Sequence, residues 1–321
     1  MTFLARTTAY APGSIGNVGP GLDVLGAAVT GAGDSVTAEW NDVPGVVIRD
    51  AGDPELPLEI ARHASGLAAM AVIRAATALG TTTPAGGIAL TVTKGLPLSA
   101  GQGGSAASAV AGAAAVNALL GSPLGTPALL SACLAAEEAV AGRHLDNIAP
   151  SLLGGIVLVR SIDPIDVVAL PVPPSLRVVL AHPNQRLRTA DARAILPREI
   201  PRATAVHQIA QVAAMVAALY TGDLALLGRA IDDRIAEPAR ATLLPGFREA
   251  KESALEAGAL GASISGAGPT AFALCDGDLV AERVAAAMLA AYARAGVTAT
   301  VRTALIDTTG TRIERVTSEP R

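Results

Sequence analysis

Alternation of apolar and polar side chains predicts several strands in the first third of the chain. Residues 4–12 alternate and end at Pro12. Two further runs, 24–29 and 35–40, are separated by a Gly-Ala-Gly-Asp segment that is typical of a turn. Residues 87–93 alternate again. We therefore expect four strands before residue 95.

Helical spacing of apolar residues predicts helices along the rest of the chain, interspersed with further strands. Helices and strands do not alternate strictly, which favours an α+β fold. The pattern breaks over 161–174, where four prolines occur, so we expect two domains, residues 1–168 and 169–321. The charged tail from Thr308 is expected to be loose. The expected helices are 58–79, 105–120, 127–141, 202–220, 223–235, 246–257 and 278–295, and the later strands are 176–181, 271–275 and 297–303.

The composition indicates a folded chain with an aliphatic core. The 321 residues are 51% apolar but only 2% aromatic, so the core must consist of Ala, Val, Leu and Ile. The net charge of −4 and the lack of a basic run argue against nucleic acid as a partner. The two cysteines, Cys133 and Cys275, match no metal-binding spacing and are expected to be small buried hydrophobes in a reducing cytosol.

Two stretches bear on targeting and membranes. The N-terminus lacks a basic region followed by a long apolar one, so we expect no signal peptide. Residues 95–136 carry no charge, and this length could span a membrane. The stretch is mostly Ala, Gly and Ser, however, and Pro97, Pro123 and Pro127 interrupt it. A pair of buried helices in a soluble protein fits these residues better.

A glycine-dense loop before the helix expected at 105–120 is the first candidate site. Glycines at this density let backbone N–H groups turn toward one point, and the N-terminus of the following helix adds its positive dipole end. Phosphate suits such a cradle, although a flexible turn before a buried helix would also explain the glycines. Neither a Walker A nor a dinucleotide-binding pattern occurs. The loop consists of Pro97, Leu98, Ser99, Ala100, Gly101, Gln102, Gly103, Gly104, Ser105, Ala106 and Ala107.

Two other glycine-rich loops accompany it, at 12–23 and 263–270. In their order and spacing the three loops resemble the motifs of the galactokinase, homoserine kinase, mevalonate kinase and phosphomevalonate kinase superfamily. Three further stretches, at 144–155, 189–197 and 237–247, together with Asn17 to Gly26, resemble the homoserine kinases within it.

The resemblance covers about residues 5 to 305 and departs from the family pattern in the first loop. Gln102 stands where the superfamily usually has leucine, and Gly104 where it has a serine. The lost hydroxyl could weaken a contact with phosphate or Mg²⁺.

The resemblance implies a two-domain fold of the GHMP kinase type. Its N-terminal domain would bind the nucleotide and contain a left-handed βαβ unit, and its C-terminal domain would be ferredoxin-like. It also implies a cytoplasmic, homodimeric enzyme that uses ATP and Mg²⁺ to convert L-homoserine to O-phospho-L-homoserine, in threonine biosynthesis.

Homoserine is a small zwitterion with a primary hydroxyl, and five residues at family positions suit it. Arg193 and Arg240 can each bind a carboxylate with two N–H groups, and Asp23 can bind the ammonium. Asn17 and Asn147 offer neutral hydrogen bonds. Turn formation is the competing explanation for Asn17 and Asp23, since both residue types favour such loops.

The predicted ATP site is the loop from Pro97 to Ala107, whose Gly101, Gly103 and Gly104 amides would line the phosphates. Ser105 would contact phosphate or metal through its hydroxyl. Magnesium usually takes one or two carboxylates plus phosphates, and Glu137 matches the family pattern for it. Glu138 is the alternative ligand, because the linker to His144 is one residue shorter than expected.

Catalysis of phosphoryl transfer mainly requires positioning and neutralisation of charge. Thr189 is expected near the γ-phosphate, with Arg193 nearby. Mevalonate kinase-like relatives have a basic Asp in the region of Asn147, so the hypothesis is that Asn147 only aligns the hydroxyl and no strong general base acts. Asp146 is the alternative base, with a structural role preferred, and His144 is expected to fix the loop.

Two other functions remain open. The chain could be another small-molecule kinase of the superfamily, although a sugar substrate would need neither the two arginines nor Asp23. It could also be a non-catalytic ligand-binding protein, which would have no reason to keep the whole set of polar residues.

Overall fold

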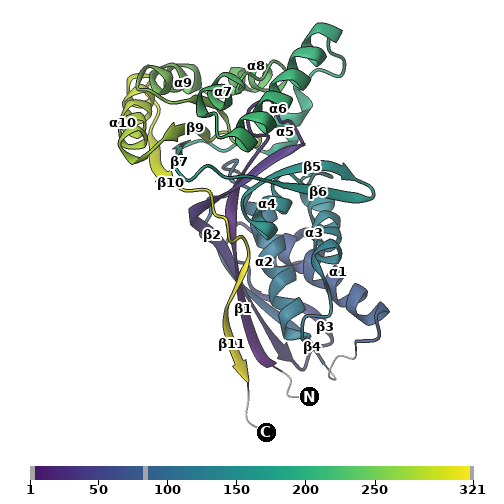
Figure 1. The fold of residues 1–321 in the computed structure, drawn as a ribbon. Helices are drawn as coiled ribbons and strands as arrows, with labels where there is room; N and C mark the ends of the chain where they lie inside the picture. Colours follow the sequence, from purple (N-terminus) through teal and green to yellow (C-terminus); the bar gives the residue numbers. More distant parts are fainter. Residues whose placement is uncertain (1–3, 82–85, 319–321) are drawn as a thin grey trace.

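The computed structural model describes residues 4–81 and 86–318. The N-terminal half is built on a seven-stranded sheet, with the order β11-β1-β2-β4-β3 and with β5 and β6 attached along β2 (Figure 1). Most neighbours are antiparallel, whereas β3 and β4 run parallel and are joined through α1, which makes a βαβ unit. The strands are β1 (Leu4–Gly16), β2 (Leu25–Asn41), β3 (Gly45–Asp50), β4 (Gly87–Thr93), β5 (Ile156–Ile162), β6 (Ile165–Leu170) and β11 (Arg312–Ser318).

Helices cover one face of this sheet, and their small side chains allow close packing. The second helix is buried on nearly all sides, because alanine occupies most of its positions. This is the uncharged stretch after residue 95, and it forms a buried helix pair as expected. The helices are α1 (Ala64–Ala78), α2 (Gly104–Leu119), α3 (Thr126–Val140) and α4 (Ile148–Leu153).

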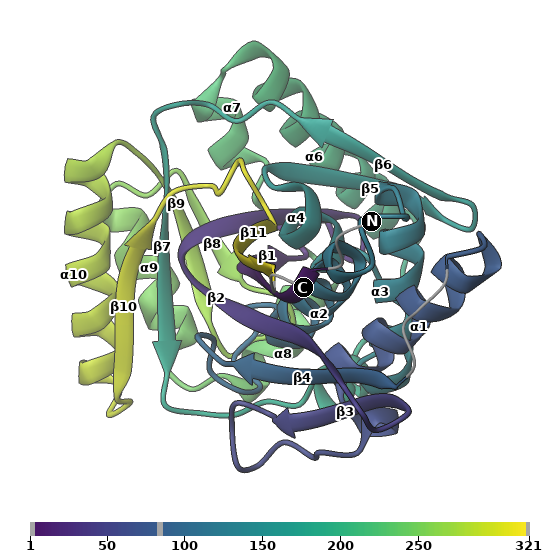
Figure 2. The ribbon, with the colours of Figure 1, turned by 90° about the horizontal axis from the view of Figure 1, so that it is seen from below.

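The C-terminal half contains a four-stranded antiparallel sheet with the order β10-β7-β9-β8. This is the strand order of a ferredoxin-like fold, as the resemblance predicts. One face packs on α9 and α10, and the other packs toward the N-terminal half (Figure 2). The strands are β7 (Leu176–Pro183), β8 (Gly261–Ile264), β9 (Ala271–Asp276) and β10 (Ala299–Ala304), and the helices are α5 (Thr189–Ala194), α6 (Arg202–Thr221), α7 (Leu224–Arg229), α8 (Ala236–Arg240), α9 (Phe247–Glu256) and α10 (Asp278–Arg294).

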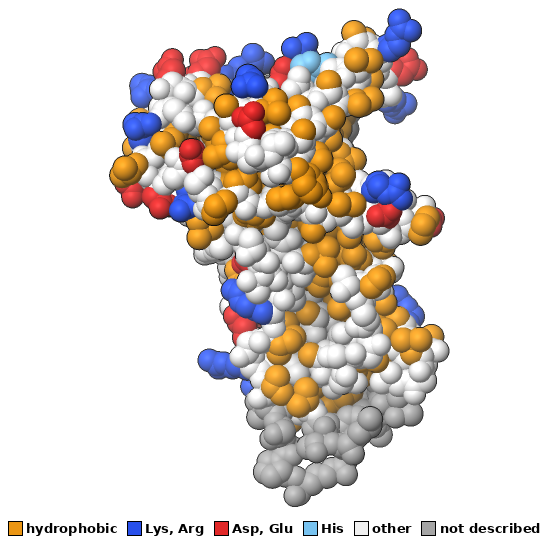
Figure 3. All heavy atoms as spheres, viewed as in Figure 1, with side chains coloured by type: hydrophobic (Ala, Val, Ile, Leu, Met, Phe, Trp, Pro, Cys, Tyr) orange, Lys and Arg blue, Asp and Glu red, His pale blue; other side chains and the backbone are white. Residues whose placement is uncertain are grey.

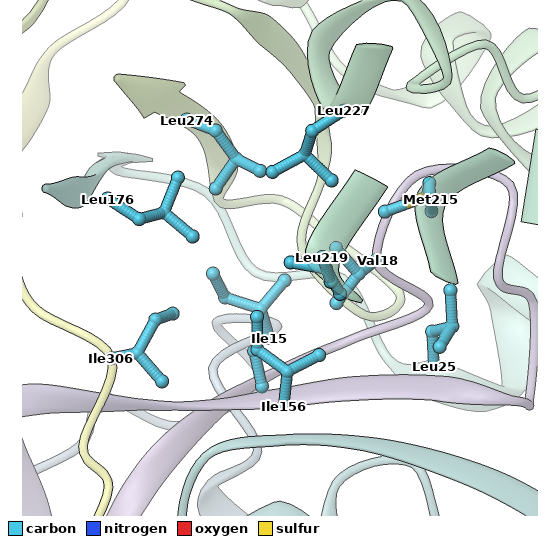
Figure 4. A pocket seen from close by; sticks show the side chains of 11 residues that line it. Ile15, Val18, Leu25, Ile156, Leu176, Met215, Leu219, Leu227, Leu274 and Ile306 are labelled. Carbon is cyan, nitrogen blue, oxygen red and sulfur yellow. The ribbon is translucent and has the colours of Figure 1, made fainter. Parts of the chain in front are cut away.

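An apolar core joins the two halves. Ile15 and Leu25 from the first half meet Leu176 and Leu274 from the second, and α6 adds Met215 (Figure 4). Only about 20 Å³ of space remains between these side chains, and no polar group lines it. This space is a packing gap between the halves, too small and too apolar for a ligand.

Two sequence predictions are wrong. The runs at 24–29 and 35–40 belong to one strand, β2, because Gly33 pairs with Pro12 while Val29 pairs with Gly13, and the residues between bulge without reversing the chain. The tail is not loose, since β11 pairs with β1. Sequence patterns also missed β3, β6 and α4. The division between residues 168 and 169 stays a prediction, and β11 lies in the sheet of the first half.

Candidate active site

A cavity of about 670 Å³ lies between the two halves. Its walls come from segments far apart in sequence: the loop after β1, the glycine loop before α2, the end of α3, and α5, α8 and the loop before β9. The three glycine-rich loops of the sequence therefore meet at one place. The volume is enough for a nucleotide beside a second small molecule.

The glycine loop is shaped by contacts that only glycine permits. Gly101 and Gly103 have φ angles of 72° and 68°. A Cβ at Gly101 would lie 2.5 Å from the carbonyl oxygens of Ser265 and Gly268, and one at Gly103 would lie 2.1 Å from the Ser14 hydroxyl oxygen. Ser265 also donates a hydrogen bond of 2.6 Å to the Gly101 carbonyl. The third glycine loop thus fixes the first.

The N-terminus of α2 faces the cavity. Gly103 precedes the helix, and Gly103, Gly104 and Ser105 line the space. The first turn carries no acidic side chain, so its free N–H groups and the helix dipole favour a bound anion.

Ser105 and Glu137 meet beside this helix end. The Ser105 hydroxyl donates a 2.9 Å hydrogen bond to Glu137 Oε1, while Oε2 has no partner in the described residues. Glu137 is 2% exposed, and burial raises the pKa of its carboxyl. Glu138 is exposed and lies 4.0 Å from Arg143. The geometry thus favours Glu137 over Glu138 as a ligand for a cation.

A buried ion pair behind the glycine loop was missed in the sequence. Lys94 Nζ binds the Asp34 carboxylate and also donates to Ser108 Oγ at 3.0 Å and to the Gly104 carbonyl at 3.3 Å. Asp34 in turn accepts from the Leu96 amide at 3.2 Å. Lys94 is the only basic residue between Arg74 and Arg143, which was a usable signal.

At the other end of the cavity, Asp23 and Arg193 bind each other. Arg193 Nη2 donates to Asp23 Oδ1 at 2.5 Å and Nη1 donates to Oδ2 at 3.2 Å. Asn17 Oδ1 accepts from the Asp23 amide at 2.8 Å, and Asn17 and Asp23 have φ angles of 56° and 60°. Asn17 and Asp23 therefore also form the turn, so the two explanations coexist.

Arg240 is held rigidly beside this pair. Its side chain is 2% exposed and donates to the Gly266 carbonyl at 2.9 Å and to the Ala192 carbonyl at 3.3 Å. Burial, followed by the nearby charge of Arg193, lowers the pKa of Arg240. Two guanidinium groups share the site with only one exposed-side carboxylate between them, so a second carboxylate would be stabilised there.

Asn147 lies between this charged end and the glycine loop. Its Oδ1 accepts a 2.9 Å hydrogen bond from Ser14, and it lines the cavity. Asp146 accepts from the Asn17 amide at 3.0 Å and is buried, which raises the pKa of its carboxyl. His144 Nδ1 lies 3.5 Å from Asp146 Oδ1, and neither ring nitrogen makes a hydrogen bond in the described residues.

Two more residues complete the lining. Thr189 begins α5 and faces the cavity. His63, which the sequence analysis left out, lines the end near Leu56 and Ala64, is 3% exposed, and has no hydrogen-bond partner among the described residues. Burial, with the charge of Lys94, lowers the pKa of His63, so a neutral imidazole faces the cavity.

Two family models match this chain. The GHMP kinase N-terminal domain matches residues 67–155 and the GHMP kinase C-terminal domain matches residues 215–294. Among relatives, the homoserine kinase of Chloroherpeton thalassium is 40% identical over 89% of this chain and 92% of its own length. That of Arabidopsis thaliana is also 40% identical, over 89% of this chain and 78% of its own length.

The solved structure of homoserine kinase from Cytophaga hutchinsonii superposes with a TM-score of 0.90, at 40% identity, covering 97% of this chain and 98% of the other. The chain belongs to the homoserine kinase family. L. major mevalonate kinase, at 18% identity and a TM-score of 0.71, shares the fold over 96% of this chain.

Membership of the homoserine kinase family confirms the predicted fold and enzyme class. All five residues expected to bind homoserine lie at one end of the cavity or directly behind it, and the glycine loop lies between them and His63. The described residues contain no cluster of three acidic, histidine or cysteine side chains that could hold a metal alone. In a kinase of this family, ATP is the expected phosphoryl donor.

Proposed function

We propose that this enzyme transfers the γ-phosphoryl group of ATP to the side-chain hydroxyl of L-homoserine, giving ADP and O-phospho-L-homoserine for threonine biosynthesis. The observation that carries this proposal is the grouping of Arg193, Arg240 and Asp23 at one end of a cavity whose centre is the N-terminus of α2. The arginines would bind the α-carboxylate and Asp23 the ammonium, once Asp23 and Arg193 exchange part of their mutual contact for substrate.

The triphosphate would lie on the glycine loop. The amides of Gly101, Gly103 and Gly104 would bind phosphate oxygens, and Lys94 would keep the loop against α2. The base and ribose would then extend toward His63, since the opposite direction leads to the homoserine end.

Magnesium fits the residues beside the helix terminus. Glu137 offers one carboxylate oxygen without a partner, and Ser105 offers a hydroxyl already within 2.9 Å of that carboxylate. One carboxylate and one hydroxyl match the few protein ligands that Mg²⁺ takes when phosphates supply the rest. When bound, the ion would neutralise charge on the phosphates. Releasing the buried carboxylate from its unpaired state is a further reason for a cation there.

Asn147 would align the homoserine hydroxyl with the γ-phosphorus. The hydroxyl oxygen forms the new P–O bond as the bond to ADP breaks, and its proton passes late to a phosphate oxygen. Asn147 has no basicity for this proton, and the Asp146 carboxylate is engaged by the Asn17 amide. Thr189 and Arg193 would contact the transferring group from α5.

The experiment is ADP release with Mg²⁺-ATP across homoserine, serine, mevalonate and galactose. Homoserine should give the highest kcat/KM, and no signal with millimolar homoserine would contradict the proposal. Asn147→Ala and Asn147→Asp then test the alignment. A steep loss of kcat in Asn147→Ala with Asn147→Asp well tolerated would argue for a basic role instead.

We further propose that the enzyme acts in the cytoplasm as a homodimer, with small molecules as its only substrates and without a membrane or nucleic acid as partner. The family resemblance supports this, together with the net charge of −4. The domain division after residue 168 is proposed on the same basis.

A further inference from the structure

Helix α6 is apolar on two faces, although only one is buried in the chain. Its inner face contributes Met215 and Leu219 to the core between the halves. On its outer face Val206, Ile209 and Tyr220 are 61%, 69% and 61% exposed. Among the described residues it is also the one helix that is long and apolar enough to span a membrane. A helix that is hydrophobic all round normally has a partner on both sides.

The exposed face forms a continuous stripe, here called the α6 stripe. It carries no charge, and no charged residue occurs between Arg202 and Asp223 at the two ends of the helix. Figure 1 shows α6 on the opposite side of the C-terminal half from α10, and Figure 3 shows hydrophobic side chains gathered over this part of the surface, with charged ones toward its rim. The stripe consists of Ala203, Val206, Ile209, Ala210, Ala213, Ala217 and Tyr220.

The α6 stripe is nearly symmetric about its middle. Large side chains stand toward the ends and alanines stand at Ala210, Ala213 and Ala217. If a second α6 crosses it antiparallel at Ala213, Val206 of each copy faces Tyr220 of the other. The alanines at the crossing allow two helix axes to approach within about 8–10 Å. A surface that matches itself under a two-fold rotation suits a symmetric homodimer.

We propose that the α6 stripe is the dimer interface of this enzyme, with α6 packing antiparallel against α6 of a second copy. Charge supports this occupant. The antiparallel arrangement brings the exposed Arg202 of one copy next to the exposed Asp223 of the other at both ends of the interface. A parallel pairing would instead place like charges together.

The same charges disfavour a membrane surface as the occupant. Helices that lie on membranes carry lysine and arginine along the polar face and often tryptophan on the apolar one. From Ala203 to Gly222 α6 has no lysine, arginine or tryptophan.

The interface would also steady the homoserine end of the cavity. Gln208, on the inner face of α6, donates to the Pro20 carbonyl at 2.9 Å, within the loop that carries Asn17 and Asp23. Gln208 also donates to Asp233 at 2.8 Å. Fixing α6 from outside therefore fixes this loop from behind.

Sedimentation of the full-length enzyme tests the proposal independently of whether it phosphorylates homoserine. The unmodified chain should sediment at twice its own mass at micromolar concentration. Ala213→Arg should halve that mass, because it places two like charges at the crossing point. Leu289→Arg, at an exposed position of α10, is the matched control and should remain a dimer. A monomeric unmodified chain, or a dimeric Ala213→Arg variant, would overturn the proposal.

A charge-pair rescue tests the antiparallel register. Val206→Glu and Tyr220→Lys should each weaken the dimer at least tenfold, and the double variant should recover it. The two positions are about 21 Å apart on one helix, so the new pair can form only between copies. Failure of the double variant to recover would overturn the register. Flotation with phosphatidylcholine–phosphatidylserine vesicles that Ala213→Arg abolishes, with a monomer in solution, would favour the membrane instead.

Discussion

Arg193 binds both carboxylate oxygens of Asp23, at 2.5 and 3.2 Å, across the end of the cavity where homoserine is expected. Sequence reasoning assigned these two side chains to opposite ends of the zwitterion. Their mutual contact means that each substrate group must compete with an existing ion pair. The pair keeps both charges in place before homoserine arrives.

Arg193→Ala should therefore raise the KM for homoserine about 100-fold, while the KM for ATP changes less than about threefold. Loss of a hydrogen-bonded charge pair with the substrate carboxylate costs about 1.5–3 kcal/mol, and an unpaired Asp23 adds to it. Steady-state kinetics with each substrate varied would measure both constants. Arg177→Ala, which removes a surface arginine paired with Asp278, is the control and should change neither. Equal increases in both KM values would contradict the assignment.

The two glycines that begin α2 should respond in opposite ways. Gly104 has space for a side chain, since a Cβ would meet its nearest neighbour, Lys94 Nζ, at 3.6 Å, so Gly104→Ser should leave the unfolding free energy within about 0.5 kcal/mol. Gly103→Ala should lose about 2 kcal/mol or more, because the φ angle is positive and Ser14 lies in the way. Urea unfolding of both variants would measure this. Equal losses would mean that the loop adapts.

Gly104→Ser also tests the departure from the family motif. The added hydroxyl lies beside the expected phosphates, so the variant should bind ATP at least as tightly as the unmodified enzyme. A tenfold increase in the KM for ATP would show that the loop requires glycine there.

His63→Ala should weaken ADP binding about 3- to 10-fold and leave tripolyphosphate binding unchanged. A neutral imidazole without a partner suits a hydroxyl or base nitrogen, and one hydrogen bond contributes about 0.5–1.5 kcal/mol. Calorimetric titration with both ligands would separate the nucleoside contact from the loop, and His63→Asn should bind ADP better than His63→Ala. An equal loss for both ligands would instead indicate a distorted loop.

Asp146 should make stability fall as pH rises. Burial raises the pKa of this carboxyl in the folded protein above its ordinary value of 3.8, so the folded state holds the proton longer than the unfolded state. Unfolding free energy from this group therefore falls from about pH 3.8 up to the raised folded value and stays low above it. Asp146→Asn should show a flatter dependence in urea titrations from pH 4 to 8. A parallel slope in the variant would rule out this source.

The sequence predicted the site better than it predicted the strands. The glycine loops and the residues for homoserine were found because motifs hold their spacing along the chain. The Lys94–Asp34 pair was missed because its members are 60 residues apart and each looks ordinary in its own segment. Strand β11 was missed because its charged residues indicate solvent, whereas the partner that makes it a strand, β1, is at the other end of the chain.

The position of β11 also constrains how the protein can be made. The sheet of the first half needs a strand that is synthesised last, after the entire ferredoxin-like half. On the ribosome, the first half can collapse early but cannot complete its sheet until the C-terminus emerges. Leading and trailing halves must therefore finish folding together, and expression of residues 1–168 alone would leave the β1 edge open to pairing with other chains.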